Sequence, residues 1–193
     1  MMVLAFLITI LVLNAVFMEP LFELGVNIIH SMQVGFESKV FAGFMNFFSL
    51  ICNTPIISLV FLIEMGLAKH KLKAIIHLSF FLLGFHIIAI LKAAYQQSRP
   101  IWVSSEIQRW EWFCPTDFGN PSGHSYVAFP LFEPLFSKYE VFENLKLAWI
   151  FSIFFGIVVP FSRMYLGVHS MNQIFFGFSF GMAWILIYRY GLR

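Results

Sequence analysis

The chain has 193 residues, of which 60% are hydrophobic and only 11% are charged. A soluble chain of this length would alternate polar and apolar residues, whereas here the apolar runs reach about the 20 residues that a membrane-spanning helix needs. The net charge of +2 is small and the basic residues are dispersed, which argues against a nucleic-acid partner and predicts an integral, multi-pass membrane protein.

The N-terminal part, residues 1–39, is predicted to hold an anchor followed by an interfacial helix. Residues 1–18 are apolar, without a basic residue ahead of the apolar core or a clear cleavage site. A retained anchor is therefore favoured over a cleaved signal peptide. Residues 19–39 place leucines and isoleucines at helical spacing with glutamates on other faces, a pattern typical of an amphipathic helix at the membrane interface.

Residues 40–193 are predicted to form the helical core of a single membrane-embedded domain that covers residues 1–193. Residues 40–68 are apolar, but Asn53, Thr54 and Pro55 break the run, so only its second part is expected to span. The further predicted spans are 74–95, 122–136, 147–162 and 170–188. Together with the first two, they predict an all-α fold, a bundle of about six transmembrane helices.

This topology places the loop 96–120 and the turn 163–169 on one side of the membrane. The basic residues expected on the opposite side are Lys69, Lys71, Lys73, Lys138, Lys146, Arg189 and Arg193. Cytoplasmic loops carry an excess of Lys and Arg. The loop 96–120 is therefore predicted to be non-cytoplasmic, that is, lumenal, periplasmic or extracellular.

One cation, Lys92, precedes this loop, and a second, Arg99, lies near its start. Lys92 and Arg99 are seven residues apart, about two helical turns, which would place both on one helix face near its end. Such a pair attracts an anion. Taken alone, the pair is equally typical of long side chains that reach from a membrane span to the interface without any chemistry.

A second segment suits the start of a helix. Asn120 is a good capping residue and Pro121 fits the first helical position, so the free amides of Ser122, Gly123 and His124 would point outward and bind an anion. His124 lies next to that cradle, where its imidazole can transfer protons near neutral pH. A capped helix start without chemistry is the alternative for this segment.

A third segment brings Arg163 to the end of one span and His169 to the start of the next, with Gly167 easing the turn. One histidine as nucleophile, a second as general acid and cations around the oxygens form a set for phosphoryl transfer through a phosphohistidine. The cations supply the charge that a metal would bring, so no metal or other cofactor is expected. Cys52 and Cys114 lie far apart and indicate neither a disulfide nor a metal site.

The strings KAAYQQSRP, PSGH and SRMYLGVH, the last followed by Gln173, resemble the three signature motifs of the type 2 phosphatidic acid phosphatase superfamily. This superfamily includes lipid phosphate phosphatases, prenyl diphosphate phosphatases, glucose-6-phosphatases and soluble vanadium haloperoxidases. The resemblance implies that phosphate is bound by Lys92, Arg99, Ser122, Gly123 and Arg163. It further implies that His169 is the nucleophile, and that His124 protonates the leaving alcohol and then activates water.

Gln173 departs from the family pattern, in which this position is an Asp that orients the nucleophilic histidine. A glutamine carbonyl also accepts a proton from the imidazole and fixes its tautomer, but it lacks the charge that stabilises an imidazolium. Glucose-6-phosphatases resemble this chain in having Gln there. Trp102, shortly after Arg99 and Pro100, is a second feature that resembles these enzymes. The short chain and its six-span plan instead resemble small bacterial lipid or undecaprenyl diphosphate phosphatases.

The sequence therefore predicts a membrane phosphatase that acts on a phosphate ester at the non-cytoplasmic face, with membrane lipids as partners. A lipid phosphate or diphosphate is favoured slightly over a sugar phosphate such as glucose 6-phosphate. One alternative is a non-catalytic membrane protein that keeps the fold and the anion pocket as a binding or assembly module. Another, a vanadate-dependent peroxidase, conflicts with the continuous hydrophobic spans.

Overall fold

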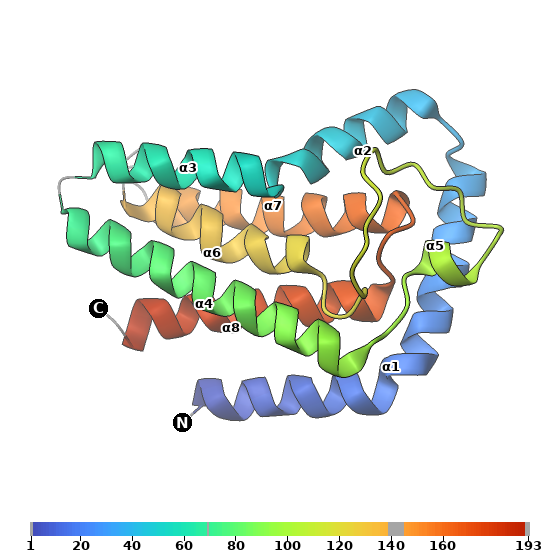
Figure 1. The fold of residues 1–193 in the computed structure, drawn as a ribbon, viewed down its shortest axis with the longest axis horizontal. Helices are drawn as coiled ribbons and strands as arrows, with labels where there is room; N and C mark the ends of the chain where they lie inside the picture. Colours follow the sequence, from blue (N-terminus) through green and yellow to red (C-terminus); the bar gives the residue numbers. More distant parts are fainter. Residues whose placement is uncertain (1, 69, 139–144, 192–193) are drawn as a thin grey trace.

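The structure, a computed structural model, describes residues 2–68, 70–138 and 145–191, and these form helices and loops without a strand. The elements are α1 (Met2–Gly35), α2 (Lys39–Ile51), α3 (Thr54–Leu67), α4 (Lys71–Tyr95), α5 (Pro100–Val103), α6 (Gly123–Lys138), α7 (Leu145–Tyr165) and α8 (Met171–Gly191). The predicted all-α class is confirmed (Figure 1). Two of the predicted cytoplasmic basic residues, Lys69 and Arg193, lie outside the described residues.

Three helical segments of the described residues are long and apolar enough to cross a membrane: Ala5–Gly35, Lys71–Val103 and Met171–Gly191. The pair α2 and α3 forms a fourth candidate that is bent by 45°. The bend falls where the sequence predicts a break, because Pro55 has no amide hydrogen and fits only the first turn of a new helix. α7 adds a shorter apolar helix, Ile150–Tyr165, so the total of about six spans stays a prediction.

The predicted anchor and interfacial helix form one continuous helix, α1, which contains Pro20. The boundary expected between the anchor and the interfacial helix therefore falls inside one helix. In Figure 1 the first part of α1 runs alongside the bundle and the second part turns across its end, and an internal proline, which removes a helical hydrogen bond, is a physical cause of such a turn. The second part packs closely on α8, since a Cβ added at Gly25 would lie 2.7 Å from the amide nitrogen of Met171.

The centre of the bundle is α6, which packs most extensively against α7 and α8. α6 and α8 touch through their backbones. A Cβ added at Gly177 would lie 2.2 Å from the carbonyl oxygen of Ser122, and one added at Gly181 would lie 2.5 Å from that of Tyr126. Only glycine permits this approach. The start of α6 is thereby fixed against the first turns of α8.

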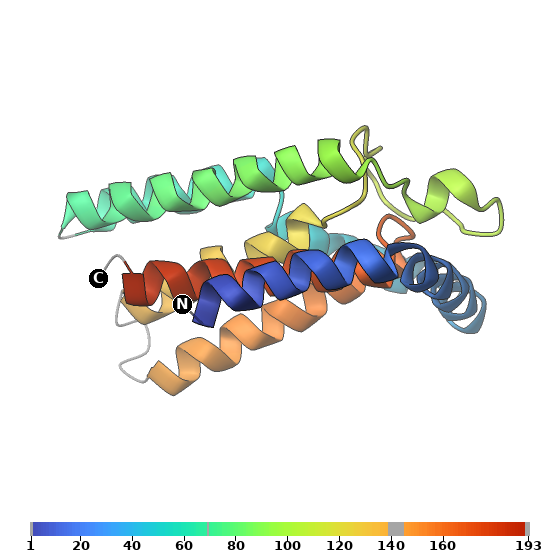
Figure 2. The same ribbon diagram turned by 90° about the horizontal axis from the view of Figure 1, so that it is seen from below.

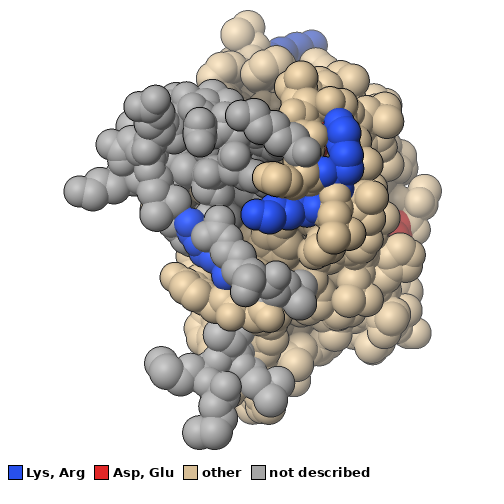
Figure 3. All heavy atoms as spheres, turned by 90° about the vertical axis from the view of Figure 1, so that its left-hand side faces the viewer, with Lys and Arg blue, Asp and Glu red and all other residues tan. Residues whose placement is uncertain are grey.

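The remaining helices lie on either side of this centre. Figure 2 shows α4 on one side of α8 and α7 on the other. α3 packs mainly against α4. Lys and Arg side chains are prominent, and acidic ones are barely visible, on the end of the molecule that holds both chain termini (Figure 3). The loop 104–122, between α5 and α6, lies at the other end of the bundle (Figure 1).

Candidate active site

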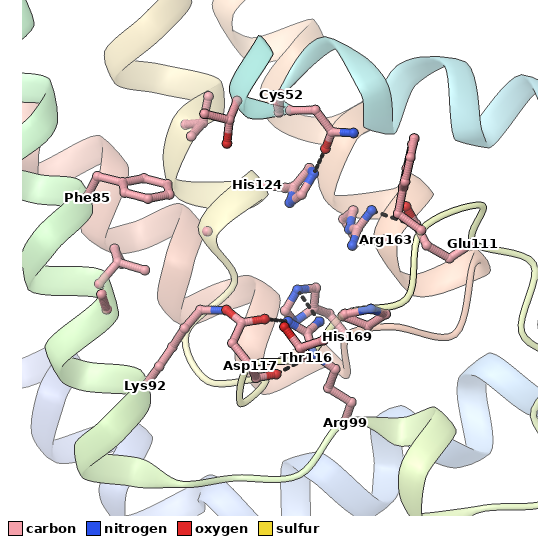
Figure 4. A pocket seen from close by; sticks show the side chains of 18 of the residues that line it. Cys52, Phe85, Lys92, Arg99, Glu111, Thr116, Asp117, His124, Arg163 and His169 are labelled. Atoms are coloured by element: carbon pink, nitrogen blue, oxygen red, sulfur yellow. Dashed lines mark hydrogen bonds and ion pairs between the residues drawn. The ribbon is translucent and has the colours of Figure 1, made fainter. Parts of the chain in front are cut away.

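A cavity of about 300 Å³ opens at the end of the bundle that holds the loop 104–122. Its walls come from the end of α4, the break between α2 and α3, the start of α6, the end of α7 and the loop itself. The charged and histidine side chains that line it are Lys92, Arg99, Glu111, Asp117, His124, Arg163 and His169. In Figure 4 these side chains converge from segments far apart in the sequence.

His169 lies in the turn between α7 and α8 and is only 1% exposed. The turn depends on Gly167, whose φ of +79° is the left-handed region that glycine adopts without cost. The amides of Val168 and His169 both donate to the carbonyl of Arg163, at 3.2 and 3.3 Å. This compact turn fixes the imidazole relative to the guanidinium of Arg163.

The two ring nitrogens of His169 have different partners. Nη1 of Arg99 lies 3.0 Å from Nε2, and because an arginine only donates, Nε2 carries the lone pair. Nδ1 lies 3.2 Å from Oε1 of Gln173. Nε2 of Gln173 donates to the carbonyl of Ser98 at 2.8 Å and to Oε1 of Gln97 at 3.2 Å, which assigns its oxygen to His169. His169 is therefore protonated at Nδ1, and the lone pair on its Nε2 accepts a hydrogen bond from Arg99.

The protonation of His169 also follows from its surroundings. Burial lowers the pKa of this imidazole, and the positive charges of Arg99, Arg163 and Lys92 lower it further, to well below its usual value. A neutral imidazole is the form that attacks an electrophile. The surroundings thus favour the neutral form of His169.

Asp117, on the loop 104–122, joins two of the cations. Its Oδ2 lies 2.5 Å from Nζ of Lys92, and its Oδ1 lies 2.6 Å from Nη2 of Arg99. Burial alone would raise the pKa of Asp117, but these two cations outweigh it and hold the pKa below its usual value. The side chain of Asp117 is 57% exposed, so its carboxylate is a solvent-accessible anion seated between two cations at the edge of the cavity.

Arg163 has a buried counter-charge. Its Nη1 donates to Oε2 of Glu111 at 2.7 Å, and the two side chains are each 4% exposed. Nη1 also donates to the hydroxyl of Ser49 on α2. Charges buried to this degree persist only when they are paired and hydrogen-bonded. Glu111 therefore holds the guanidinium at a defined place in the wall of the cavity.

Lys92 and Arg99 both contact Asp117, but the backbone segments that carry them differ from the predicted arrangement. They do not share a helix face, because α4 ends at Tyr95 and Gln96 adopts a left-handed conformation with φ 46°. Arg99 is extended and caps α5, as expected for a residue before a proline, whose ring disfavours the helical conformation. The expectation of one helix face was wrong, yet both cations line the cavity.

The segment 120–124 also departs in part from expectation. Ser122 is fully buried; its amide donates to the carbonyl of Gln173 at 2.9 Å, and its hydroxyl oxygen accepts from Ser125. It does not line the cavity, so the structure does not place it as a phosphate ligand. Gly123 and His124 do line the cavity, and their amides, in the first turn of α6, have no intrahelical acceptor.

His124 contacts a residue outside the predicted motifs. Its Nε2 lies 2.8 Å from Oδ1 of Asn53, at the break between α2 and α3. In Figure 4 the His124 ring points into the cavity from α6. Sequence reasoning identified Asn53 only as a helix breaker, and it assigned no role in the site to Glu111 or Asp117. Three cations near a membrane need counter-charges. This need is the signal that would have pointed to the two carboxylates.

Comparison with known proteins identifies the family and the fold. A model of the PAP2 superfamily matches residues 73–193, more than half of the chain. The chain belongs to the PAP2 superfamily. No curated protein matches its sequence. Among solved structures, this PAP2 chain resembles the first transmembrane PAP2 type phosphatidylglycerolphosphate phosphatase from Bacillus subtilis, with a TM-score of 0.79 and 19% sequence identity over 97% of this chain and 94% of that one.

Family and fold together support a phosphatase that is an integral membrane protein. The range that matches the PAP2 model holds all three predicted motifs and begins after Asn53. Within the described residues, no group of three or more His, Cys, Asp or Glu side chains is arranged to hold a metal ion. The charged and histidine side chains that line this PAP2 cavity are two imidazoles, three cations and two carboxylates.

Proposed function

We propose that the protein is a membrane phosphatase that hydrolyses a phosphate ester through a covalent phosphohistidine on His169. The observation that carries this proposal is the tautomer of His169. Arg99 and Gln173 contact opposite nitrogens of the ring, which leaves Nε2 as an unprotonated nucleophile at a cavity lined by Lys92 and Arg163. A nucleophile with a fixed tautomer beside anion-binding cations is what phosphoryl transfer to histidine requires.

In the first step, Nε2 of His169 attacks phosphorus while the bond to the leaving oxygen breaks. The cations Lys92, Arg99 and Arg163 hold the non-bridging oxygens, and the free amides of Gly123 and His124 add hydrogen bonds. His124 gives its proton to the leaving oxygen. In the second step, His124 takes a proton from water, whose oxygen attacks phosphorus, and the N–P bond breaks to release inorganic phosphate.

Asp117 must leave Lys92 and Arg99 before phosphate occupies them, and Nη1 of Arg99 must move from Nε2 of His169 to a phosphate oxygen before that nitrogen attacks. The exchange is favourable because a phosphate dianion brings more charge and three acceptor oxygens, whereas the half-exposed carboxylate returns to water at little cost. Glu111 stays with Arg163, since separating that buried pair is costly. Before substrate binds, the formal charges of the three cations and two carboxylates sum to +1. When Asp117 is displaced, the positive charges of Lys92 and Arg99 become available to the phosphate.

An apolar groove favours a lipid phosphate over a sugar phosphate. The groove, about 400 Å³, runs between α3 and α4. It shares Thr54, Ile57 and Phe85 with the catalytic cavity. Along α3 it extends from Thr54 to Met65, which at 1.5 Å per residue is roughly 17 Å and close to one leaflet of a hydrocarbon core about 30 Å thick.

We infer that the hydrophobic chain of a lipid substrate lies in this groove while its phosphate lies among the cations. A sugar phosphate would leave the groove without use. The solved relative described above is a phosphatidylglycerolphosphate phosphatase, which supports a lipid phosphate as the substrate class. Gln173, shared with glucose-6-phosphatases by resemblance, keeps glucose 6-phosphate among the esters to be tested.

We infer further that the cavity faces the non-cytoplasmic side. Lys and Arg side chains are prominent on the opposite end of the molecule (Figure 3), and the cytoplasmic side of a membrane protein carries the excess of these residues. Surface labelling of Cys114, an exposed thiol on the loop 104–122, with a membrane-impermeant maleimide in right-side-out cells tests this orientation. Labelling only after permeabilisation would reverse it.

The activity itself is tested by release of inorganic phosphate from detergent-purified protein. Phosphatidylglycerol phosphate, phosphatidic acid, undecaprenyl diphosphate, glucose 6-phosphate and p-nitrophenyl phosphate are compared, with His169→Ala as the inactive control. We expect turnover of at least one lipid phosphate, loss of turnover in the variant, and an acid-labile phosphoenzyme in the wild type alone. A folded wild-type protein that releases no phosphate from any ester would favour the non-catalytic binding module.

A further inference from the structure

Asn53 has an unusual position for a helix-capping residue. It precedes α3 with extended backbone angles, φ −82° and ψ 148°, yet its side chain makes no capping hydrogen bond. A capping asparagine normally accepts from the amide of the second or third helical residue. Here the second residue is Pro55, which has no amide hydrogen. The side chain does not cap the third residue either, and its carboxamide reaches His124 instead.

The contact with His124 is specific to one ring nitrogen. Oδ1 of Asn53 lies 2.8 Å from Nε2 of His124, and a carboxamide oxygen only accepts, so the proton of the neutral imidazole is on Nε2. Within the part of the chain that the structure describes, Nδ1 of His124 has no hydrogen-bond partner. This nitrogen is the one left available to the cavity, where His169 and the cations lie.

We propose that Asn53 is a positioning residue that holds His124 with its Nε2 proton fixed, so that Nδ1 alone exchanges protons with the substrate. This inference rests on the proposed function and adds to it a residue from outside the range that matches the PAP2 model. It also separates the two walls of the site. The nucleophile is oriented by residues of the matched range, and the acid is oriented by the break between α2 and α3.

The proton transfers then have defined atoms. In the first step, His124 in its imidazolium form, which has taken a second proton from solvent at Nδ1, gives that proton to the leaving oxygen as the P–O bond breaks and the N–P bond to His169 forms. In the second step, Nδ1 takes a proton from the attacking water as the N–P bond breaks. The Nε2 proton stays hydrogen-bonded to Asn53 in both steps, so the ring does not have to turn between acting as acid and acting as base.

Removal of the carboxamide tests this role. In Asn53→Ala we expect kcat/KM for a short-chain alkyl ester, dihexanoyl phosphatidic acid, to fall roughly 10- to 100-fold, the usual loss when the partner of a functional imidazole is removed. For p-nitrophenyl phosphate kcat/KM should change little, because this leaving group departs without a proton. The parameter kcat/KM reports phosphoenzyme formation, the step in which the leaving oxygen is protonated.

Asn53→Asp provides a readout that a merely structural role would not change. A carboxylate in this place keeps the acceptor and adds a negative charge beside the ring, which stabilises the imidazolium that acts as the acid. When kcat/KM for the alkyl ester is plotted against pH, the basic limb, where activity falls at high pH, should therefore shift to higher pH by about one unit or more. Asn27→Ala, at an exposed asparagine on α1, is the matched control and should leave both esters unaffected.

The outcomes separate this inference from the proposed function. Orthovanadate inhibition of p-nitrophenyl phosphate turnover should be unchanged in Asn53→Ala, which shows that the fold and the phosphate site are intact. Equal losses with the alkyl and the aryl ester, or an unmoved basic limb in Asn53→Asp, would overturn the role of Asn53 while the phosphatase stands. A wild-type protein inactive on every ester would overturn both.

Discussion

The side-chain oxygen Oε1 of Gln173 lies 3.2 Å from Nδ1 of His169. The side-chain nitrogen Nε2 of Gln173 donates hydrogen bonds to Ser98 and Gln97. A carboxylate at this position would face these two oxygen atoms without a hydrogen to donate. The glutamine is therefore matched to its surroundings, and it fixes the tautomer of the nucleophile without adding a charge.

This relationship predicts the effect of restoring a negative charge. In Gln173→Glu the carboxylate would stabilise imidazolium His169, so the acidic limb of the kcat/KM profile should move upward by about one pH unit or more. The carbonyl of Ser98 would lose its donor, and we expect a lower thermal unfolding temperature as well. The measurement is a pH profile with p-nitrophenyl phosphate beside a melting curve. A limb that stays in place would show that His169 does not titrate in catalysis.

The wild-type protein should itself remain active in mildly acidic solution. Burial and the neighbouring cations hold the pKa of His169 well below its usual value, and the neutral imidazole is the reactive form. As pH falls, activity is therefore kept until that lowered pKa is reached, so the acidic limb should lie clearly below about pH 6.5. Phosphate release between pH 4 and 8 tests this, and half-maximal activity near pH 6.5 on the acidic side would contradict it.

Asp117→Asn should strengthen binding of anions. The substitution removes the carboxylate that competes with phosphate for Lys92 and Arg99, and an exposed ion pair of up to about 1 kcal/mol corresponds to a decrease of roughly two- to fivefold in the inhibition constant for orthovanadate. KM should decrease in parallel. Asp117→Glu, which keeps the charge, is the control. A weaker inhibition by vanadate in Asp117→Asn would mean that Asp117 organises the site rather than competing for it.

Glu111→Gln should destabilise the protein, because it leaves the guanidinium of Arg163 buried without its counter-charge. Breaking a buried pair costs about 3 kcal/mol or more, so the unfolding temperature in detergent should fall measurably. A phosphate analogue would supply the missing negative charge, and orthovanadate should recover more stability in this variant than in the wild type. Equal stabilisation of both proteins by vanadate would remove Arg163 from the anion site.

A bulky side chain in the apolar groove should distinguish lipid from small substrates. Ser58 is exposed and lines the groove on α3. In Ser58→Trp, kcat/KM for a long-chain lipid phosphate should fall at least roughly tenfold, while kcat/KM for p-nitrophenyl phosphate should stay within about twofold, since steric exclusion of a chain costs more than 1.4 kcal/mol. Ser58→Ala is the control. Equal effects on both substrates would place the lipid chain elsewhere.

The sequence predicted which charged and histidine side chains line the cavity more fully than how they are held there. All five of the predicted charged and histidine residues line one cavity: Lys92, Arg99, His124, Arg163 and His169. They could be identified from the sequence because charged and histidine side chains are rare among apolar spans. How the residues are held was less visible. Lys92 and Arg99 sit on different segments, since α4 ends at Tyr95 and Gln96 adopts a left-handed conformation.

The residues that sequence reasoning missed act through tertiary contacts. Asn53 has the signature of a helix break, and nothing in its local sequence indicates that it reaches α6. Ser122 was expected at the surface of an anion site, but the close approach of α8 at Gly177 draws its backbone into the core. Partners separated by about 70 residues, such as Asn53 and His124, are set by how helices pack and not by periodicity along the chain.

The backbone contact between α6 and α8 has a mechanical consequence. Ser122 and Gly177 touch without side chains between them, so the start of α6 and the turn that carries His169 belong to one stiff unit. Asn53 lies outside this contact, at the break between α2 and α3. Under the proposed mechanism, a lipid chain in the groove between α3 and α4 lies next to the residue that orients His124, and away from the backbone contact that places His169. The proposed protonation of the leaving group is therefore the step that a displacement of α3 would affect first.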